Sequence, residues 1–163
     1  MEWIYGIDPG MTGAIAKVTI SGASYCVDDM PVEHVRNTAG KLRGQYVEQK
    51  LADLLSYSYP SQTRVFVERQ GSMPDQSAQS VFSTGFGFGL IRGVLVGRSM
   101  PYEIVHPQVW KKAMGVTSDK TTSLAKARAL FPLCDLGHRK DAGRAEALLI
   151  AEWGRRALTS QKT

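Results

Sequence analysis

Two short apolar segments of this chain each end on a carboxylate, and this pattern restricts the folds open to it. Residues 3–8 (WIYGID) end on Asp8, and residues 65–68 (VFVE) end on Glu68. A turn follows Asp8, which predicts that the first segment is a strand and that the chain reverses direction after it. A charge is costly inside a buried strand, and each acid should therefore project from a strand end. Two acids at two strand ends predict a metal site and chemistry on phosphates.

The composition is that of an ordinary globular protein. The chain has 163 residues, 43% hydrophobic and 21% charged, which predicts one domain over 1–163. We expect no membrane segment, because no apolar stretch reaches roughly 18 residues. The first residues lack the basic region of a secretory signal, and Cys26 and Cys134 match no ligand spacing. A cytoplasmic protein, in a bacterial cell or a phage-infected host, is the resulting expectation.

Positive charge gathers in the C-terminal part of the chain. Residues 1–97 hold 8 Lys and Arg against 9 Asp and Glu, whereas residues 98–163 hold 12 against 6. A basic region of this kind can contact nucleic-acid phosphates, although a solvated helical surface gives the same count.

The order of the segments predicts an α/β domain. We expect three strands at about 2–8, 13–20 and 24–30 in an antiparallel meander, then strands at 64–68 and 102–105. Polar residues predict loops at 31–44 and 69–78, and apolar spacing predicts helices at about 45–57, 79–98, 107–113, 119–130 and 142–158. Strands reached through a helix should run parallel to the first strand. The result is a five-stranded mixed sheet flanked by helices, with Asp8 and Glu68 at one edge.

Each acid also has a purely structural explanation. Asp8 can cap the turn that follows it, and Glu68 can pair with Arg69 at the surface. Glu146 lies in an Ala/Leu-rich helix, where burial calls for a cation or for an arginine such as Arg144 or Arg155. Asp141 can be the N-cap of that helix. Together at strand ends, however, the acids favour a metal, and Mg²⁺ prefers oxygen ligands.

Several motifs together resemble one known family. They are Gly6-Ile7-Asp8-Pro9-Gly10, Val67-Glu68, Gly85-Phe86-Gly87-Phe88-Gly89, Trp110-Lys111, Leu130-Phe131-Pro132 and Gly143-Arg144-Ala145-Glu146-Ala147. The set resembles the RuvC family of Holliday junction resolvases, of the RNase H-like superfamily, and in particular its phage and chloroplast members. The bacterial pattern of two acids three residues apart is broken here, because Gly143 stands at the first of those positions. The resemblance implies Asp141 as the substitute.

The resemblance implies a site and a reaction. Asp8, Glu68, Asp141 and Glu146 would hold two Mg²⁺ ions, or Mn²⁺ as a substitute, and cleavage would leave 5′-phosphate and 3′-hydroxyl ends. Lys120 would contact the scissile phosphate, unless it is an ordinary surface lysine. The protein would act as a homodimer on four-way junction DNA, without a nucleotide cofactor. The residues expected to contact DNA are Arg69, Met73, Lys111, Lys112, Lys120, Arg139, Lys140, Arg144, Arg155 and Arg156.

Other functions remain open at this stage. An RNase H-like nuclease acting on other branched DNA or on RNA–DNA hybrids fits the same residues, and so does a junction-binding protein without catalysis. Residues 6–13 (GIDPGMTG) also resemble the first phosphate loop of actin-like ATPases and sugar kinases, but those proteins need two such domains. The glycines from Gly85 to Gly97 precede no Gly-Lys-Ser/Thr, which excludes a P-loop.

Overall fold

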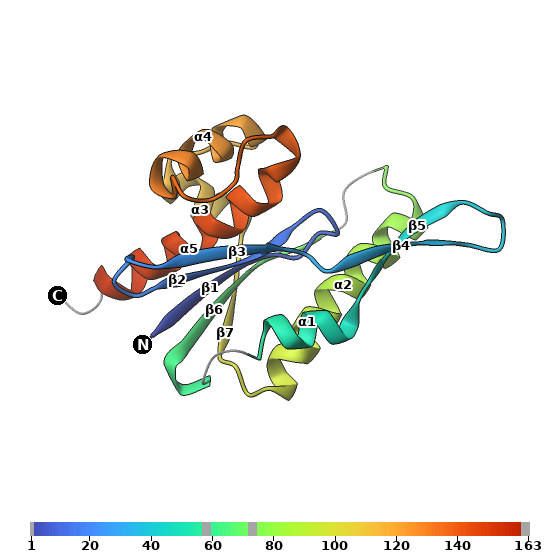
Figure 1. The fold of residues 1–163 in the computed structure, drawn as a ribbon, viewed down its shortest axis with the longest axis horizontal. Helices are drawn as coiled ribbons and strands as arrows, with labels where there is room; N and C mark the ends of the chain where they lie inside the picture. Colours follow the sequence, from blue (N-terminus) through green and yellow to red (C-terminus); the bar gives the residue numbers. More distant parts are fainter. Residues whose placement is uncertain (1, 57–59, 72–74, 161–163) are drawn as a thin grey trace.

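A five-stranded mixed sheet forms the centre of the molecule (Figure 1). The computed structural model describes residues 2–56, 60–71 and 75–160. The strands lie in the order β3-β2-β1-β6-β7 and comprise β1 (Trp3–Asp8), β2 (Ala14–Thr19), β3 (Tyr25–Asp29), β6 (Thr63–Glu68) and β7 (Tyr102–Val105). Strands β1, β2 and β3 pair antiparallel, while β6 runs parallel to β1 and β7 parallel to β6. The predicted sheet, including its two parallel strands, is confirmed.

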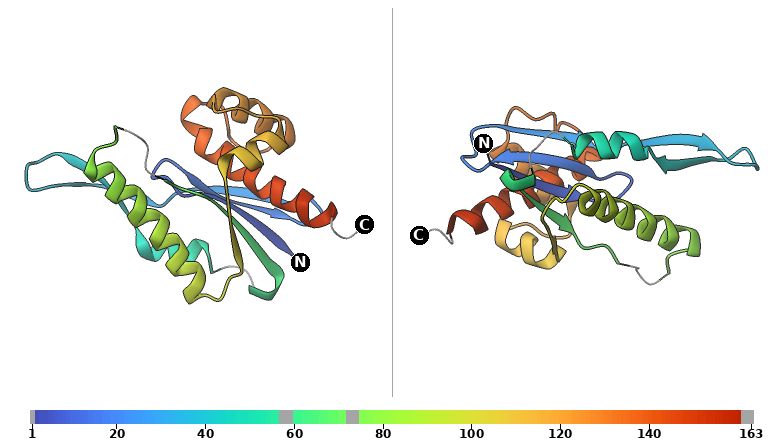
Figure 2. Two further views of the ribbon diagram at one scale, coloured as in Figure 1. Left: turned by 180° about the vertical axis from the view of Figure 1, so that it is seen from behind. Right: turned by 90° about the horizontal axis from the view of Figure 1, so that it is seen from below.

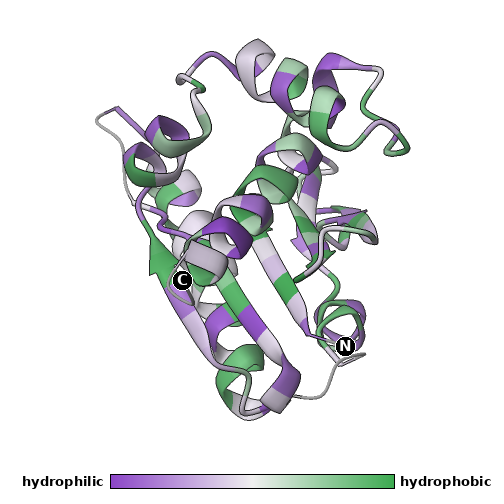
Figure 3. Ribbon diagram, turned by 90° about the vertical axis from the view of Figure 1, so that its left-hand side faces the viewer, coloured by the Kyte–Doolittle hydropathy of each residue, from purple (hydrophilic) through white to green (hydrophobic). Residues whose placement is uncertain are grey.

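Helices cover both faces of this sheet (Figures 1 and 2). One face carries α1 (Glu48–Leu54) and α2 (Ala78–Gly97), and the other carries α3 (Pro107–Met114), α4 (Lys120–Leu130) and α5 (Ala142–Ser160). Along β1, Ile4 packs into the core under α5, and Tyr5 packs into the core under α2. Successive strand residues face opposite sides, so a strand with two covered faces is apolar throughout. The hydropathy colours show such apolar stretches on the strands and the helices packed against them (Figure 3).

The predicted loop at 31–44 is wrong, because this segment forms a hairpin. Strands β4 (Val32–Arg36) and β5 (Leu42–Tyr46) pair antiparallel as a separate two-stranded sheet, which we call the arm. The side chain of Asn37 accepts hydrogen bonds from the backbone of Ala39 and Lys41, and this closes the turn. The arm extends away from the main sheet (Figure 1). It also shortens the predicted helix at 45–57, which begins only at Glu48.

Helix α2 confirms the helix predicted at 79–98 but is more apolar than the sequence analysis allowed. Its 20 residues, Ala78–Gly97, would suffice in length and composition to cross a membrane, so the expectation that no segment reaches this length was wrong. One side of α2 packs into the core through Gly87, Ile91 and Leu95. Only 17% of its apolar window is buried, which leaves an apolar surface open on this helix.

Candidate active site

The parallel pairing of β1 and β6 brings Asp8 and Glu68 to the same edge of the sheet. Ile7 lies opposite Val67 in the register, and each carboxylate is the next residue along its strand. Both side chains are buried, with exposed fractions of 9% for Asp8 and 7% for Glu68. The pairing of neighbouring strand ends predicted from the sequence is therefore confirmed.

Asp8 combines a turn contact with a place among other charged side chains. Its Oδ1 accepts a hydrogen bond from the backbone N–H of Gly10 at 3.3 Å, as the turn-capping explanation predicts. Burial, followed by the nearby charge of Glu146, raises the pKa of Asp8 to about 6. The Gly10 hydrogen bond and the ammonium groups of Lys120 and Lys111 oppose this rise in the pKa. The turn contact and a role in a charged cluster thus coexist.

Glu68 is held by Trp110 rather than by Arg69. The indole Nε1 of Trp110 donates a buried hydrogen bond to Glu68 Oε1 at 2.9 Å, and Gln70 Nε2 lies 3.5 Å from Oε2. Arg69 instead lies 3.3 Å from the ring of His106, measured from Nη1 to Nε2. Burial, followed by the charge of Asp8, raises the pKa of Glu68 to about 7, while the Trp110 hydrogen bond lowers it. Trp110 therefore fixes the orientation of this carboxylate.

Glu146 reaches the same place from α5. It is 5% exposed, and its charge raises the pKa of both Asp8 and Glu68, which places the three carboxylates within electrostatic range of one another. Its partner is Lys111, with Nζ 2.6 Å from Oε1. Neither arginine named as a structural partner serves Glu146, because Arg144 pairs with Asp29 and Arg155 pairs with Glu152.

Asp141 has partners of its own. It ends the short 3₁₀ helix η2 (Arg139–Asp141) just before α5, and its Oδ2 accepts the backbone N–H of His138 at 2.7 Å. Its Oδ1 lies 3.8 Å from Nη1 of Arg144. Asp141 is thus the third residue of a capping box whose N-cap is His138, and not itself the N-cap that the sequence suggested. The structure thus brings Asp8, Glu68 and Glu146 together and shows Asp141 in a structural role.

The basic residues divide into paired and open groups. Arg144 is bound through two nitrogens to Asp29, and Arg155 and Arg156 share Glu152, so all three guanidinium groups are engaged in ion pairs within the fold. Five of the predicted DNA contacts are exposed and make no ion pair within residues 2–56, 60–71 and 75–160: Arg69, Lys112, Lys120, Arg139 and Lys140. Met73 lies outside the described residues. The predicted DNA contacts that keep an unpaired charge therefore lie on α3, α4 and η2 and directly after β6.

The three clustered carboxylates suit a hard divalent cation. Their donors are all oxygens, and burial together with mutual repulsion opposes leaving them ionised without a cation. Among the residues that the structure describes, no group of three His, Cys, Asp or Glu side chains lies close enough together to hold one metal ion. Lys111 and Trp110 each occupy one oxygen of the cluster. Lys111 would therefore compete with a cation for Oε1 of Glu146.

Comparison with known proteins gives the fold. Two solved structures of RuvC from Thermus thermophilus match almost all of this chain. The one in complex with a Holliday junction substrate has a TM-score of 0.65 and 15% identity, and covers 98% of this chain and 96% of its own. The other has a TM-score of 0.58 and 19% identity, and covers 97% and 96%. The chain has the fold of RuvC.

A curated relative strengthens the RuvC likeness at the level of sequence. The chloroplastic Holliday junction resolvase MOC1 of Chlamydomonas reinhardtii is 30% identical over 149 residues. The match covers 78% of this chain but only 17% of MOC1, so the chain spans about a sixth of that protein. No protein-family model matches the chain. The fold thus supports the predicted likeness to RuvC-type proteins, and the sequence supports the predicted likeness to a chloroplast member.

Proposed function

We propose that residues 1–163 form a single metal-dependent nuclease domain that resolves four-way DNA junctions by paired symmetric cuts. The observation that carries the proposal is the cluster of Asp8, Glu68 and Glu146, buried at the sheet edge of a RuvC fold with raised pKa values on two of its members. Support for the substrate comes from the relatives, namely a chloroplastic Holliday junction resolvase and a RuvC bound to a Holliday junction. A cytoplasmic location stays a prediction.

The chain's own residues explain how such a site would work. Asp8, Glu68 and Glu146 would hold Mg²⁺, with Asp141 as a fourth ligand only if it leaves its cap. Bound ions would activate a water and stabilise the leaving 3′ oxygen, giving 5′-phosphate and 3′-hydroxyl ends. Trp110 keeps Glu68 in place, and Lys120 lies close enough to Asp8 to lower its pKa. Once Lys111 releases Glu146, its ammonium becomes available to a DNA phosphate.

The function is tested by mapping cuts on labelled DNA. We expect the protein with Mg²⁺ to cut a four-way junction at two symmetric positions and to leave ends that a ligase seals directly. Linear duplex, flap and RNA–DNA hybrid substrates of the same sequence serve as controls. Equal cutting of linear duplex would contradict a dedicated resolvase, and preferential cutting of the hybrid would favour the related RNase H-like activity.

We also propose that the open side of α2 pairs two copies of the chain. Its exposed apolar side chains include Phe82 and Val96, which are 70% and 65% exposed, and Phe86 stacks near Phe82 with 6.4 Å between ring centroids. A symmetric junction calls for two sites related by a two-fold axis, and a homodimer supplies them. An apolar surface on a long helix is a suitable interface for it.

The dimer proposal predicts a change in mass upon substitution. We expect wild-type protein to sediment as a dimer and Phe82→Glu to sediment as a monomer, because a charge in an apolar interface is costly. Leu133→Glu is the matched control, since Leu133 is 89% exposed and lies far from α2 in the sequence. If wild type is monomeric at micromolar concentration, or Phe82→Glu stays dimeric, α2 is not the interface.

A further inference from the structure

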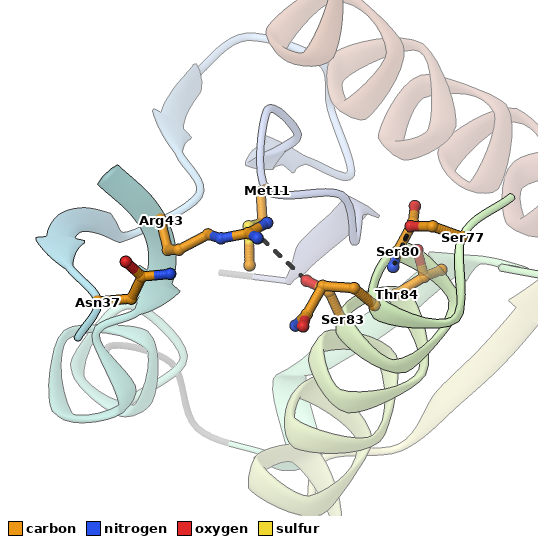
Figure 4. A pocket seen from close by; sticks show the side chains of 9 residues that line it. Met11, Asn37, Arg43, Ser77, Ser80, Ser83 and Thr84 are labelled. Carbon is orange, nitrogen blue, oxygen red and sulfur yellow. Dashed lines mark hydrogen bonds between the residues drawn. The ribbon is translucent and has the colours of Figure 1, made fainter. Parts of the chain in front are cut away.

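A polar groove runs between the arm and the first turns of α2. Its volume is about 570 Å³, and its lining includes Arg43 and Asn37 from the arm and Ser80, Ser83 and Thr84 from α2. The close-up shows the arm residues on one side and the α2 hydroxyls on the other, with Met11 between them (Figure 4). The groove lies outside the carboxylate cluster, since none of its lining residues is Asp, Glu or Lys.

The lining chemistry favours an anion. Arg43 is exposed and makes no ion pair with any residue in the described part of the chain. Hydroxyl groups and the Asn37 amide can donate further hydrogen bonds, and no carboxylate in the lining competes for them. Arginine presents a planar set of donors that matches a phosphate group. The arm as a whole is basic, with Arg36, Lys41 and Arg43 against Glu33.

The groove is joined to the active site through a shared turn. Met11 lines the groove, and its turn begins at Asp8, so one stretch of backbone contributes to both places. The arm is anchored there as well, because the buried Tyr46 hydroxyl donates to the carbonyl of Pro9 at 2.9 Å. Tyr46 also packs closely on Gly87 of α2, where a Cβ atom would overlap the Tyr46 ring. Burial, followed by the charge of Asp8, raises the pKa of Tyr46 to about 12.

We propose that this groove binds the sugar–phosphate backbone of the DNA strand that leads to the active site, with Arg43 on a phosphate. The inference rests on the proposed function and adds a second contact region to it, away from the basic residues of α3, α4 and η2. An extended strand seated against Met11 continues directly to Asp8 along the same turn. The arm then helps to set which phosphate reaches the carboxylates.

The test compares two arginine substitutions in junction binding without metal. Arg43→Gln removes the proposed contact. Arg64→Gln is the control, because Arg64 lies at the opposite end of β6 from Glu68 and donates a hydrogen bond to the carbonyl of Thr63. Both lose one positive charge. We expect Arg43→Gln to weaken junction binding by roughly tenfold. We also expect the slope of log affinity against log salt to fall by about one, and Arg64→Gln to match wild type.

Hydroxyl-radical footprinting on the same complexes locates the proposed Arg43 contact along the DNA backbone. Wild type should protect backbone on one side of the cut, and Arg43→Gln should lose that protection while protection at the cut itself persists. Equal affinities and footprints for wild type and Arg43→Gln would overturn the groove proposal. If wild type itself neither binds nor cuts junctions, the proposed function fails instead, so the two failures are distinguishable.

Discussion

Asp8→Asn is expected to abolish junction cleavage with Mg²⁺ while leaving junction binding intact, and Glu68→Gln to do the same. Each substitution removes a charged oxygen ligand but keeps the shape of the side chain and its hydrogen-bond acceptor. Asn at position 8 can still accept the Gly10 N–H, so the turn should survive. Cleavage rate and metal-free binding affinity of the same preparations are the measurements. Cutting at the wild-type rate by either variant would show that the metal site is misassigned.

Asp8→Asn should also stabilise the metal-free protein. Folding raises the pKa of Asp8 from 3.8 to about 6 and that of Glu68 from 4.5 to about 7. A carboxyl with a raised pKa destabilises the fold where it is ionised. The penalty is absent below the unfolded values, grows as the pH rises through the folded values, and is complete above pH 7. Without metal, Asp8→Asn should therefore gain about 1–3 kcal/mol at pH 8 and almost nothing at pH 4.

Thermal unfolding in a chelator at pH 4, 6 and 8 measures this difference. Arg64→Gln provides a control for a change of one charge far from the cluster. Excess Mg²⁺ should then raise the melting temperature of wild type at pH 8 and leave that of Asp8→Asn nearly unchanged, since ligand binding stabilises only a protein that binds it. A variant less stable than wild type at pH 8 without metal would contradict the repulsion among these carboxylates.

Gly143→Asp, which restores the bacterial spacing of two acids three residues apart, is expected to destabilise the fold. A Cβ atom at residue 143 would overlap the carbonyl oxygen of Thr12, at the place where the start of α5 rests on the β1–β2 turn. Overpacking of this kind costs about 3 kcal/mol, and the added charge would be buried. The melting temperature should fall by roughly 10 °C.

Two alanine variants separate packing from charge. Gly143→Ala should show much of the loss of stability expected for Gly143→Asp, because the Cβ atom alone already overlaps Thr12. Gly97→Ala should be neutral or stabilising, because nothing lies within 4 Å of a Cβ atom there and alanine favours helix. Denaturation by urea compares the three. A fully stable Gly143→Asp would refute the close approach of α5 to the Asp8 turn and reopen residue 143 as a ligand position.

The sequence predicted the part of the site that depends on strand order. Asp8 and Glu68 end apolar strands, and the parallel pairing of such strands follows from the helix between them. Their partners depend on how α3 packs, which no local pattern shows. Trp110 and Lys111 are adjacent in sequence, yet Trp110 binds Glu68 and Lys111 binds Glu146. From the sequence, the expected partners were the arginines nearest in the chain, Arg69 for Glu68 and Arg144 for Glu146. In the structure Arg69 contacts His106 and Arg144 pairs with Asp29.

The arm was missed for a different reason. Residues 31–44 are polar on both sides, so they lack the alternation that marks a strand with one buried face. The sequence did carry a turn signal, because Asn37 and Gly40 are spaced to close a hairpin. In the structure Gly40 has a φ of 74°, which glycine adopts readily. Tyr46, at the end of β5, is the residue that fixes the arm to the body.

The contact between Gly143 and Thr12 also bears on how a substrate is chosen. It joins the helix that carries Glu146 to the turn that follows Asp8 by direct backbone packing, and buried core residues surround both. This contact holds the turn after Asp8 and the helix that carries Glu146 at a fixed spacing. Under the proposed function we therefore expect the bending to come from the nucleic acid, so that substrates with unstacked, easily deformed branch points enter at a lower cost than a stiff continuous duplex.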